Sequence, residues 1–151
     1  GGEPMLQQEE LQPLVKSMAA EGYTFEMETN GTIPPTTGML RHIGQWNVSP
    51  KLRTSGNQLL ETQNPLALQT FAALPDAYFK FVIAVESDVD EVCTLRDQYN
   101  LAPQRILLMP EGRTLDALAR KSAWLPELCV QHGFRFTTRL HIILWGDERG
   151  R

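Results

Sequence analysis

The feature that most restricts the fold of this chain is a nearly continuous apolar run, Tyr78-Phe-Lys-Phe-Val-Ile-Ala-Val85. Aromatic and β-branched residues favour a strand, and near-continuous apolarity is typical of a strand covered on both faces, as in a parallel sheet. Parallel strands are joined by crossover connections, which are usually helices. The run therefore predicts an α/β fold in which strands and helices alternate.

Strand and helix patterns on both sides of this run support the prediction. Further strands are expected over 23–28, 45–48, 106–109 and 140–144, and helices over 11–22, 66–74, 89–99 and 115–132. The first helix is indicated by the helical spacing of Leu11, Leu14, Val15 and Met18. We expect a parallel sheet with right-handed crossovers. The sequence contains no internal repeat and no obvious interdomain linker, which predicts a single domain.

Composition excludes several classes of protein. The 151 residues are 42% hydrophobic and 21% charged, as in ordinary globular chains. A formal net charge of -4 argues against a nucleic-acid binder that relies on positive charge. No apolar run approaches the roughly 18 residues that span a bilayer. We therefore expect a cytoplasmic protein that binds neither nucleic acid nor membrane.

The cysteines and histidines limit the metal chemistry of this chain. Cys93 and Cys129 form no CxxC pair, and two thiolates cannot supply the three or four ligands that an iron–sulfur cluster takes from its protein. The three histidines are dispersed, and the sequence has no GxSxG, HExxH, P-loop or GxGxxG motif. We expect no metal ligand and no catalytic residue in this chain, and we interpret both cysteines as small buried hydrophobic residues.

Polar, turn-forming sequence follows the predicted strands, where parallel sheets bind their ligands. The candidates are Gly1-Gly2-Glu3-Pro4, Glu28-Thr29-Asn30-Gly31-Thr32 and Asn47-Val48-Ser49-Pro50-Lys51, with Arg113 and His141. Glycines allow close approach of a ligand to the backbone, and a carboxylate can hold an ammonium group. Each candidate also has a structural interpretation. The three segments can be, in the order given, a simple turn, an Asx turn and a strand exit with a solvated lysine. Arg113 can cap the next helix, and His141 can be a structural histidine.

Seven segments, taken together and in order, resemble the 7-carboxy-7-deazaguanine synthases, a family of radical S-adenosylmethionine enzymes. The segments are GGEP at 1–4, ETNGTIPP at 28–35, QWNVSPKL at 45–52, SGN at 55–57, YFKFV at 78–82, LLMPEGRT at 107–114 and LHIILWGDERG at 140–150. GGE is shared by the wider superfamily, whereas WNVSPK followed by SGN and MPEGRT is more specific. The resemblance covers essentially the whole chain.

The resemblance implies a partial (β/α) barrel, S-adenosylmethionine, a [4Fe–4S] cluster and Mg²⁺. Its reaction would contract the ring of 6-carboxy-5,6,7,8-tetrahydropterin to 7-carboxy-7-deazaguanine with loss of ammonia, on the route to queuosine, with an external electron donor. A 5′-deoxyadenosyl radical would begin the reaction by abstracting hydrogen. The implied cofactor contacts are Gly1, Gly2, Glu3, Thr29, Asn30, Ser49 and Lys51, and His141 is the implied pterin contact.

The family carries its cluster cysteines, and the Mg²⁺-binding threonine beside them, upstream of its GGE segment. We therefore expect residues 1–151 to be the carboxy-terminal portion of the enzyme, inactive alone. Missing strands would leave an open sheet edge beside the strand 23–28 or its neighbour, which predicts a chain that is marginally stable or that self-associates, with a homodimer as one form. Two alternatives stay open: a non-catalytic S-adenosylmethionine-binding or docking half-barrel, and a related radical enzyme with another substrate.

Overall fold

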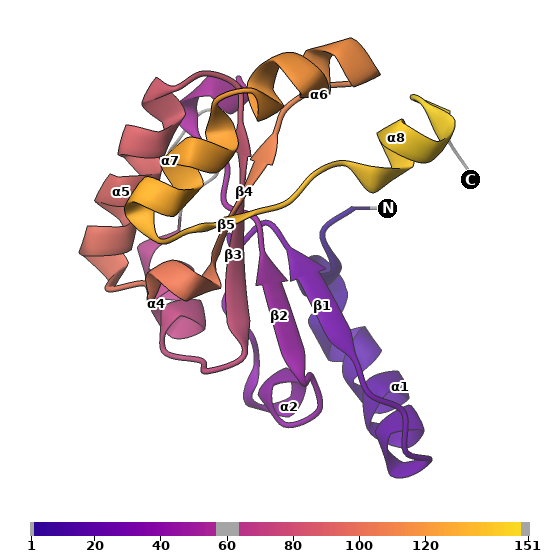
Figure 1. Cartoon of the computed structure of the whole chain (residues 1–151). Coiled ribbons are helices and arrows are strands. Elements are labelled where there is room, and N and C mark those ends of the chain that lie inside the picture. Colours follow the sequence, from indigo (N-terminus) through magenta and orange to yellow (C-terminus); the bar gives the residue numbers. More distant parts are fainter. Residues whose placement is uncertain (1, 57–63, 149–151) are drawn as a thin grey trace. The chain divides into compact units, whose positions relative to one another are not determined.

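A computed structural model describes residues 2–56 and 64–148, which form a five-stranded parallel sheet with helices between the strands (Figure 1). The strands follow the chain in the order β1-β2-β3-β4-β5. They are β1 (Glu26–Thr29), β2 (Gln45–Val48), β3 (Ala77–Ile83), β4 (Ile106–Pro110) and β5 (Arg135–Phe136). The predicted α/β class with a parallel sheet is confirmed. The partial barrel stays a prediction.

The chain divides into two compact units, and strand β3 contributes to both. The first unit contains Gly1–Lys51 and Asn57–Phe79, and the second contains Leu52–Gly56 and Lys80–Arg151. Along β3, Ala77, Phe79, Phe81 and Ile83 are buried and the residues between them are half-buried. One face of the strand is therefore fully covered.

The first unit packs helices against β1 and β2. Its helical elements are η1 (Pro4–Gln7), α1 (Gln8–Ala20), α2 (Thr37–Leu40) and α4 (Pro65–Ala72). Trp46 of β2 and Phe71 of α4 meet in the core, with ring centroids 5.4 Å apart and ring planes 53° apart. In α1, Val15 is buried but Leu14 is exposed. The predicted apolar face of this helix is therefore narrower than its spacing indicated.

The second unit alternates helices with β4 and β5. Its helical elements are η2 (Arg53–Ser55), α5 (Ser87–Tyr99), η3 (Pro103–Arg105), α6 (Leu115–Ser122), α7 (Leu125–His132) and α8 (Leu140–Trp145). The predicted helix over 115–132 is interrupted after Ser122, and Pro126 occupies the first turn of α7. Proline lacks the amide that would continue the earlier helix, so the two segments separate. Gly133 ends α7 with a φ of 70°, as predicted.

The prediction of a strand over 140–144 is wrong. These residues form α8, in which only Ile142 is buried, and the fifth strand is Arg135–Phe136. Leu107 and Leu108 of β4 lie opposite Arg135 and Phe136, so the sheet position beside β4 is filled before residue 140. A short apolar run does not distinguish a strand from a helix by periodicity. His141 therefore lies on a helix and not on a strand.

In the part of the chain that the structure describes, no helix is both long enough and apolar enough to cross a membrane.

Candidate functional site

The carboxylate of Glu3 organises the loop that follows β1. Glu3 Oε1 accepts hydrogen bonds from the Thr29 hydroxyl at 2.7 Å and from the Met5 amide at 3.1 Å. Glu3 Oε2 accepts from the Asn30 amide at 2.7 Å. Three of the predicted cofactor residues are therefore joined directly, although 26 positions separate Glu3 from Thr29.

The loop after β1 is an Asx turn with a required glycine. Asn30 Oδ1 accepts from the amide and the hydroxyl of Thr32, at 2.9 and 2.6 Å. Gly31 is buried with a φ of 76°, and a Cβ at this position would lie 2.8 Å from Val48 Cγ1. The structural interpretation of this segment is confirmed. It is compatible with ligand binding, because the turn also fixes where Thr29 and Asn30 lie.

The end of β2 lies beside this loop, as neighbouring parallel strands require. Thr29 pairs in register with Val48, and the Ser49 amide donates to the Thr29 carbonyl at 2.7 Å. Lys51 follows two residues later and is half-buried. The structure therefore brings Glu3, Thr29, Asn30 and Ser49 together at the carboxyl ends of two adjacent strands, which is the edge where such sheets bind ligands.

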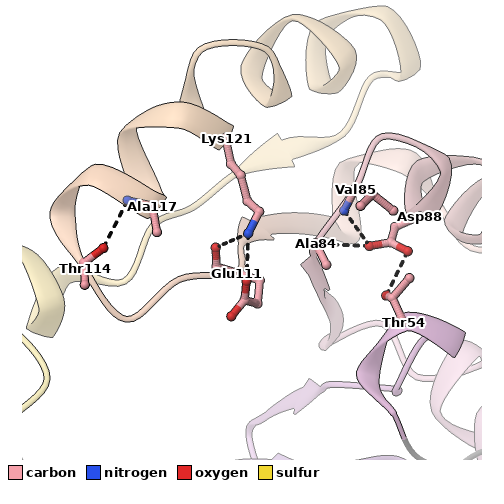
Figure 2. A network of polar contacts seen from close by, with 8 residues as sticks. All are labelled: Thr54, Ala84, Val85, Asp88, Glu111, Thr114, Ala117 and Lys121. Carbon is pink, nitrogen blue, oxygen red and sulfur yellow. Dashed lines mark hydrogen bonds and ion pairs between the residues drawn. The ribbon is translucent and has the colours of Figure 1, made fainter.

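The remaining predicted residues have different outcomes. Gly1 lies outside the described residues, and Gly2 is exposed with a φ of 118°. His141 is exposed on α8, in the second unit. Arg113 does not cap α6; Thr114 does, with its hydroxyl accepting from the Ala117 amide at 3.2 Å (Figure 2).

Polar contacts in the second unit tie the loop after β4 to its surroundings. Lys121 Nζ donates to the carbonyl and the carboxylate of Glu111, at 2.8 and 2.7 Å (Figure 2). The Lys121 hydrogen bond lowers the pKa of Glu111. Arg113 Nε donates to Asp147 at 2.7 Å, which joins this loop to the residues after α8.

Asp88 is a buried carboxylate that the sequence analysis did not single out. Its side chain accepts hydrogen bonds from the Ala84 and Val85 amides and from the Thr54 hydroxyl (Figure 2). A recognisable signal was available, since an aspartate in the first turn of the helix that follows a buried strand can accept from the amides of the turn between them. The contact with Thr54 had no sequence signal, because the two residues lie 34 positions apart.

The cysteines are free thiols on two helices of the second unit. Cys129 is buried, as predicted, and burial raises its pKa to about 11. Cys93 is half-buried, and its sulfur lies 3.5 Å from His132 Nδ1. Burial also raises the pKa of Cys93. Among residues 2–56 and 64–148, no group of three or more His, Cys, Asp or Glu side chains could hold a metal ion.

Comparison with curated proteins relates these residues to one family. A 7-carboxy-7-deazaguanine synthase of Pyrobaculum aerophilum is 35% identical over 152 residues, which cover all of this chain and 65% of that protein. A synthase of the same name from Halobacterium salinarum is 33% identical, with 97% of this chain and 63% of the relative covered. A synthase of the same name from Hyperthermus butylicus is 30% identical, with 95% of this chain and 63% of the relative covered. No family model matches the chain.

The chain is a relative of the 7-carboxy-7-deazaguanine synthases. The resemblance found in the seven segments is confirmed, and it extends over the whole chain. The chain spans somewhat less than two thirds of the length of these synthases. That this part is the carboxy-terminal one stays a prediction.

Proposed function

We propose that the protein containing this chain is a radical S-adenosylmethionine enzyme that converts 6-carboxy-5,6,7,8-tetrahydropterin to 7-carboxy-7-deazaguanine with loss of ammonia. This would make it a lyase of queuosine biosynthesis that receives electrons from an external donor. The observation that carries the proposal is the joined set of Glu3, Thr29 and Asn30 at one strand edge in a relative of these synthases.

The chemistry of this set fits the amino-acid part of S-adenosylmethionine. A carboxylate offers about four acceptor positions, and three of those on Glu3 are used by Met5, Thr29 and Asn30. One position on Oε2 is left for a donor such as the ligand's ammonium group. Because Glu3 is fixed from three sides, its carboxylate needs no rearrangement to accept that bond.

The end of β2 offers groups of complementary chemistry. The Ser49 hydroxyl can hydrogen-bond a ribose, and the Lys51 ammonium can pair with a carboxylate. When bound, S-adenosylmethionine supplies the radical chemistry of the family. The role proposed for this chain is to orient that cofactor, and His141 is proposed as a contact of the pterin substrate.

The residues described here do not fit an iron–sulfur cluster or Mg²⁺. Cys93 and Cys129 lie on separate helices, and neither belongs to a group of metal-binding side chains among the described residues. The resemblance assigns both sets of ligands to a segment that is not part of this sequence.

The test is S-adenosylmethionine binding by the full-length gene product, measured by calorimetry, with product analysis after addition of the carboxytetrahydropterin. Glu3→Gln is expected to weaken binding on the order of tenfold, because it removes the charge that the ammonium pairs with. Glu10→Gln removes a charge from the exposed surface of α1 and is the matched control.

Three outcomes would contradict the proposal. A wild-type protein that binds no S-adenosylmethionine at millimolar concentration would exclude cofactor binding. Equal affinity of wild type and Glu3→Gln would exclude the ammonium contact. Cofactor cleavage without the deazaguanine would favour a related radical enzyme that acts on another substrate.

A further inference from the structure

Asp88 accepts hydrogen bonds from two separate segments of the second unit (Figure 2). Its Oδ2 accepts from the Ala84 amide at 2.7 Å and the Val85 amide at 3.1 Å. Its Oδ1 accepts from the Thr54 hydroxyl at 2.9 Å. The residue is 2% exposed. Because all three donors converge on one buried carboxylate, the loop after β3 and the segment that contains Thr54 are fixed to a common point.

The segment Leu52–Gly56 depends on such contacts for its shape. It consists of one short turn, η2, in which the Ser55 amide donates to the Leu52 carbonyl at 3.0 Å, and it ends at Gly56 with a φ of 76°. A single 3₁₀ turn is not stable alone. A second contact with α5 holds the same segment, because Glu91 Oε2 accepts from the Arg53 amide at 3.2 Å.

This segment continues directly from the residues proposed to hold the cofactor. Thr54 is three positions after Lys51 and five after Ser49. A chain of three residues spans at most about 10 Å, so an anchor at Thr54 restricts the positions open to the peptide before it. Hydrogen bonds to a charged acceptor are also stronger than those between neutral groups, which suits a carboxylate for this role.

We propose that Asp88 is a positioning residue for cofactor binding: by holding Thr54 and the amides of Ala84 and Val85, it fixes the peptide that follows Ser49 and Lys51. This inference rests on the proposed function. Asp88 itself would touch no ligand. Its effect would pass through the Thr54 hydroxyl, the one side-chain donor in the network that can be removed without altering a backbone amide.

The experiment removes that hydroxyl in the full-length gene product. Thr54 is exposed, so Thr54→Val alters one hydrogen bond without opening a core cavity, and Thr54→Ser restores the hydroxyl. Thr94→Val is the matched control, because Thr94 lies on α5 and its hydroxyl donates to the Asp90 carbonyl of the same helix, at 2.9 Å. The two readouts are hydrogen exchange of the Ser55 and Gly56 amides and S-adenosylmethionine affinity by equilibrium dialysis.

We expect Thr54→Val to speed exchange at these two amides and to weaken S-adenosylmethionine binding several-fold, up to about tenfold. Thr54→Ser should restore both readouts, and Thr94→Val should change neither. A structural role alone would alter exchange without altering affinity, and that result would overturn the inference. Unchanged exchange in Thr54→Val would also overturn it. A wild-type protein that binds no S-adenosylmethionine would instead contradict the proposed function on which the inference rests.

Discussion

At the scale of single residues, the loop after β1 is held by short-range contacts that leave little room for change. The Thr29 hydroxyl donates to Glu3 and accepts from the Gly31 amide at 3.2 Å, and the side chain of Thr29 is almost completely buried. A polar group that is buried and satisfied on both sides holds its neighbours in one arrangement. Gly31 lies at the centre of this arrangement.

Gly31→Ala is expected to destabilise the protein by about 2–5 kcal/mol, because a left-handed conformation costs an L-residue about 1–2 kcal/mol and overpacking adds about 1–3 kcal/mol. The new Cβ would meet Val48 Cγ1 at 2.8 Å and Leu68 Cδ2 at 3.3 Å. Urea unfolding of wild type and variant measures the loss.

Gly22→Ala is the control for the cost of the left-handed backbone conformation alone. Gly22 has a φ of 90° but nothing within 4 Å of an added Cβ, so its substitution should cost only the conformational part, about 1–2 kcal/mol. Equal losses at the two glycines would contradict the packing argument and would show that the space around Gly31 relaxes.

Single residues also show what the sequence could predict of the site. Thr29, Asn30 and Ser49 were predictable because the ends of neighbouring parallel strands meet at one sheet edge. The role of Glu3 was predicted only in part. The sequence suggested that its carboxylate faces a ligand, whereas the structure shows that most of its acceptor capacity holds the protein's own loop.

At the scale of elements, the sequence predicted the starts of helices with clear caps correctly, but it did not predict the elements at the end of the chain, β5 and α8. Helix α4 begins at Pro65, directly after its cap Asn64, and lies within one or two residues of its predicted bounds. The two-residue strand β5 has no periodic pattern of its own, and both of its residues are exposed. Pairing with β4, which is a tertiary contact, defines β5, so sequence reasoning placed the strand in the apolar run that follows.

The cap of α4 has a second contact that allows a test. Asn64 Oδ1 accepts from the Leu66 and Ala67 amides, and Asn64 Nδ2 donates to the Thr32 carbonyl at 2.9 Å. Asn64→Ala removes all three bonds and should cost about 1–2 kcal/mol in the free energy of unfolding, the range for loss of a helix cap.

Asn64→Asp separates the two functions of this side chain. Aspartate keeps the cap acceptor and loses the donor to Thr32, so its cost should be smaller than that of alanine. Thermal and urea denaturation of both variants measure the difference. An aspartate loss as large as the alanine loss would mean that the contact with Thr32, and not the cap, dominates the role of Asn64.

At the scale of the whole molecule, β3 is the element that the two units share. Phe79 belongs to the first unit and Phe81 to the second, and each is 1% exposed on the same face of the strand. The strongest apolar run in the sequence thus became the strand that serves both cores. The sequence predicted the strand, because such a run suits a position inside a parallel sheet, but it did not predict that the strand would contribute to two units.

Both units take part of their core from β3. Truncating a buried side chain of β3 that belongs to one unit should therefore destabilise both units. Phe81→Ala is expected to cost about 3–5 kcal/mol, the usual range for loss of a buried aromatic ring. Trp46, which is buried in the first unit, reports on that unit by fluorescence once Trp124 and Trp145 are replaced by phenylalanine. We expect its urea midpoint to fall together with the midpoint measured by circular dichroism.

Val130→Ala is the control in the second unit, because Val130 is 82% exposed and its truncation should change stability by less than about 0.5 kcal/mol. If the Trp46 midpoint in Phe81→Ala stays at the wild-type value while the circular dichroism transition moves or splits, the two units unfold independently. In that case a shared strand would not make the sheet a single cooperative unit. Coincident shifts would instead mean that the strand couples the two units, because Phe81 belongs to the second unit and Trp46 to the first.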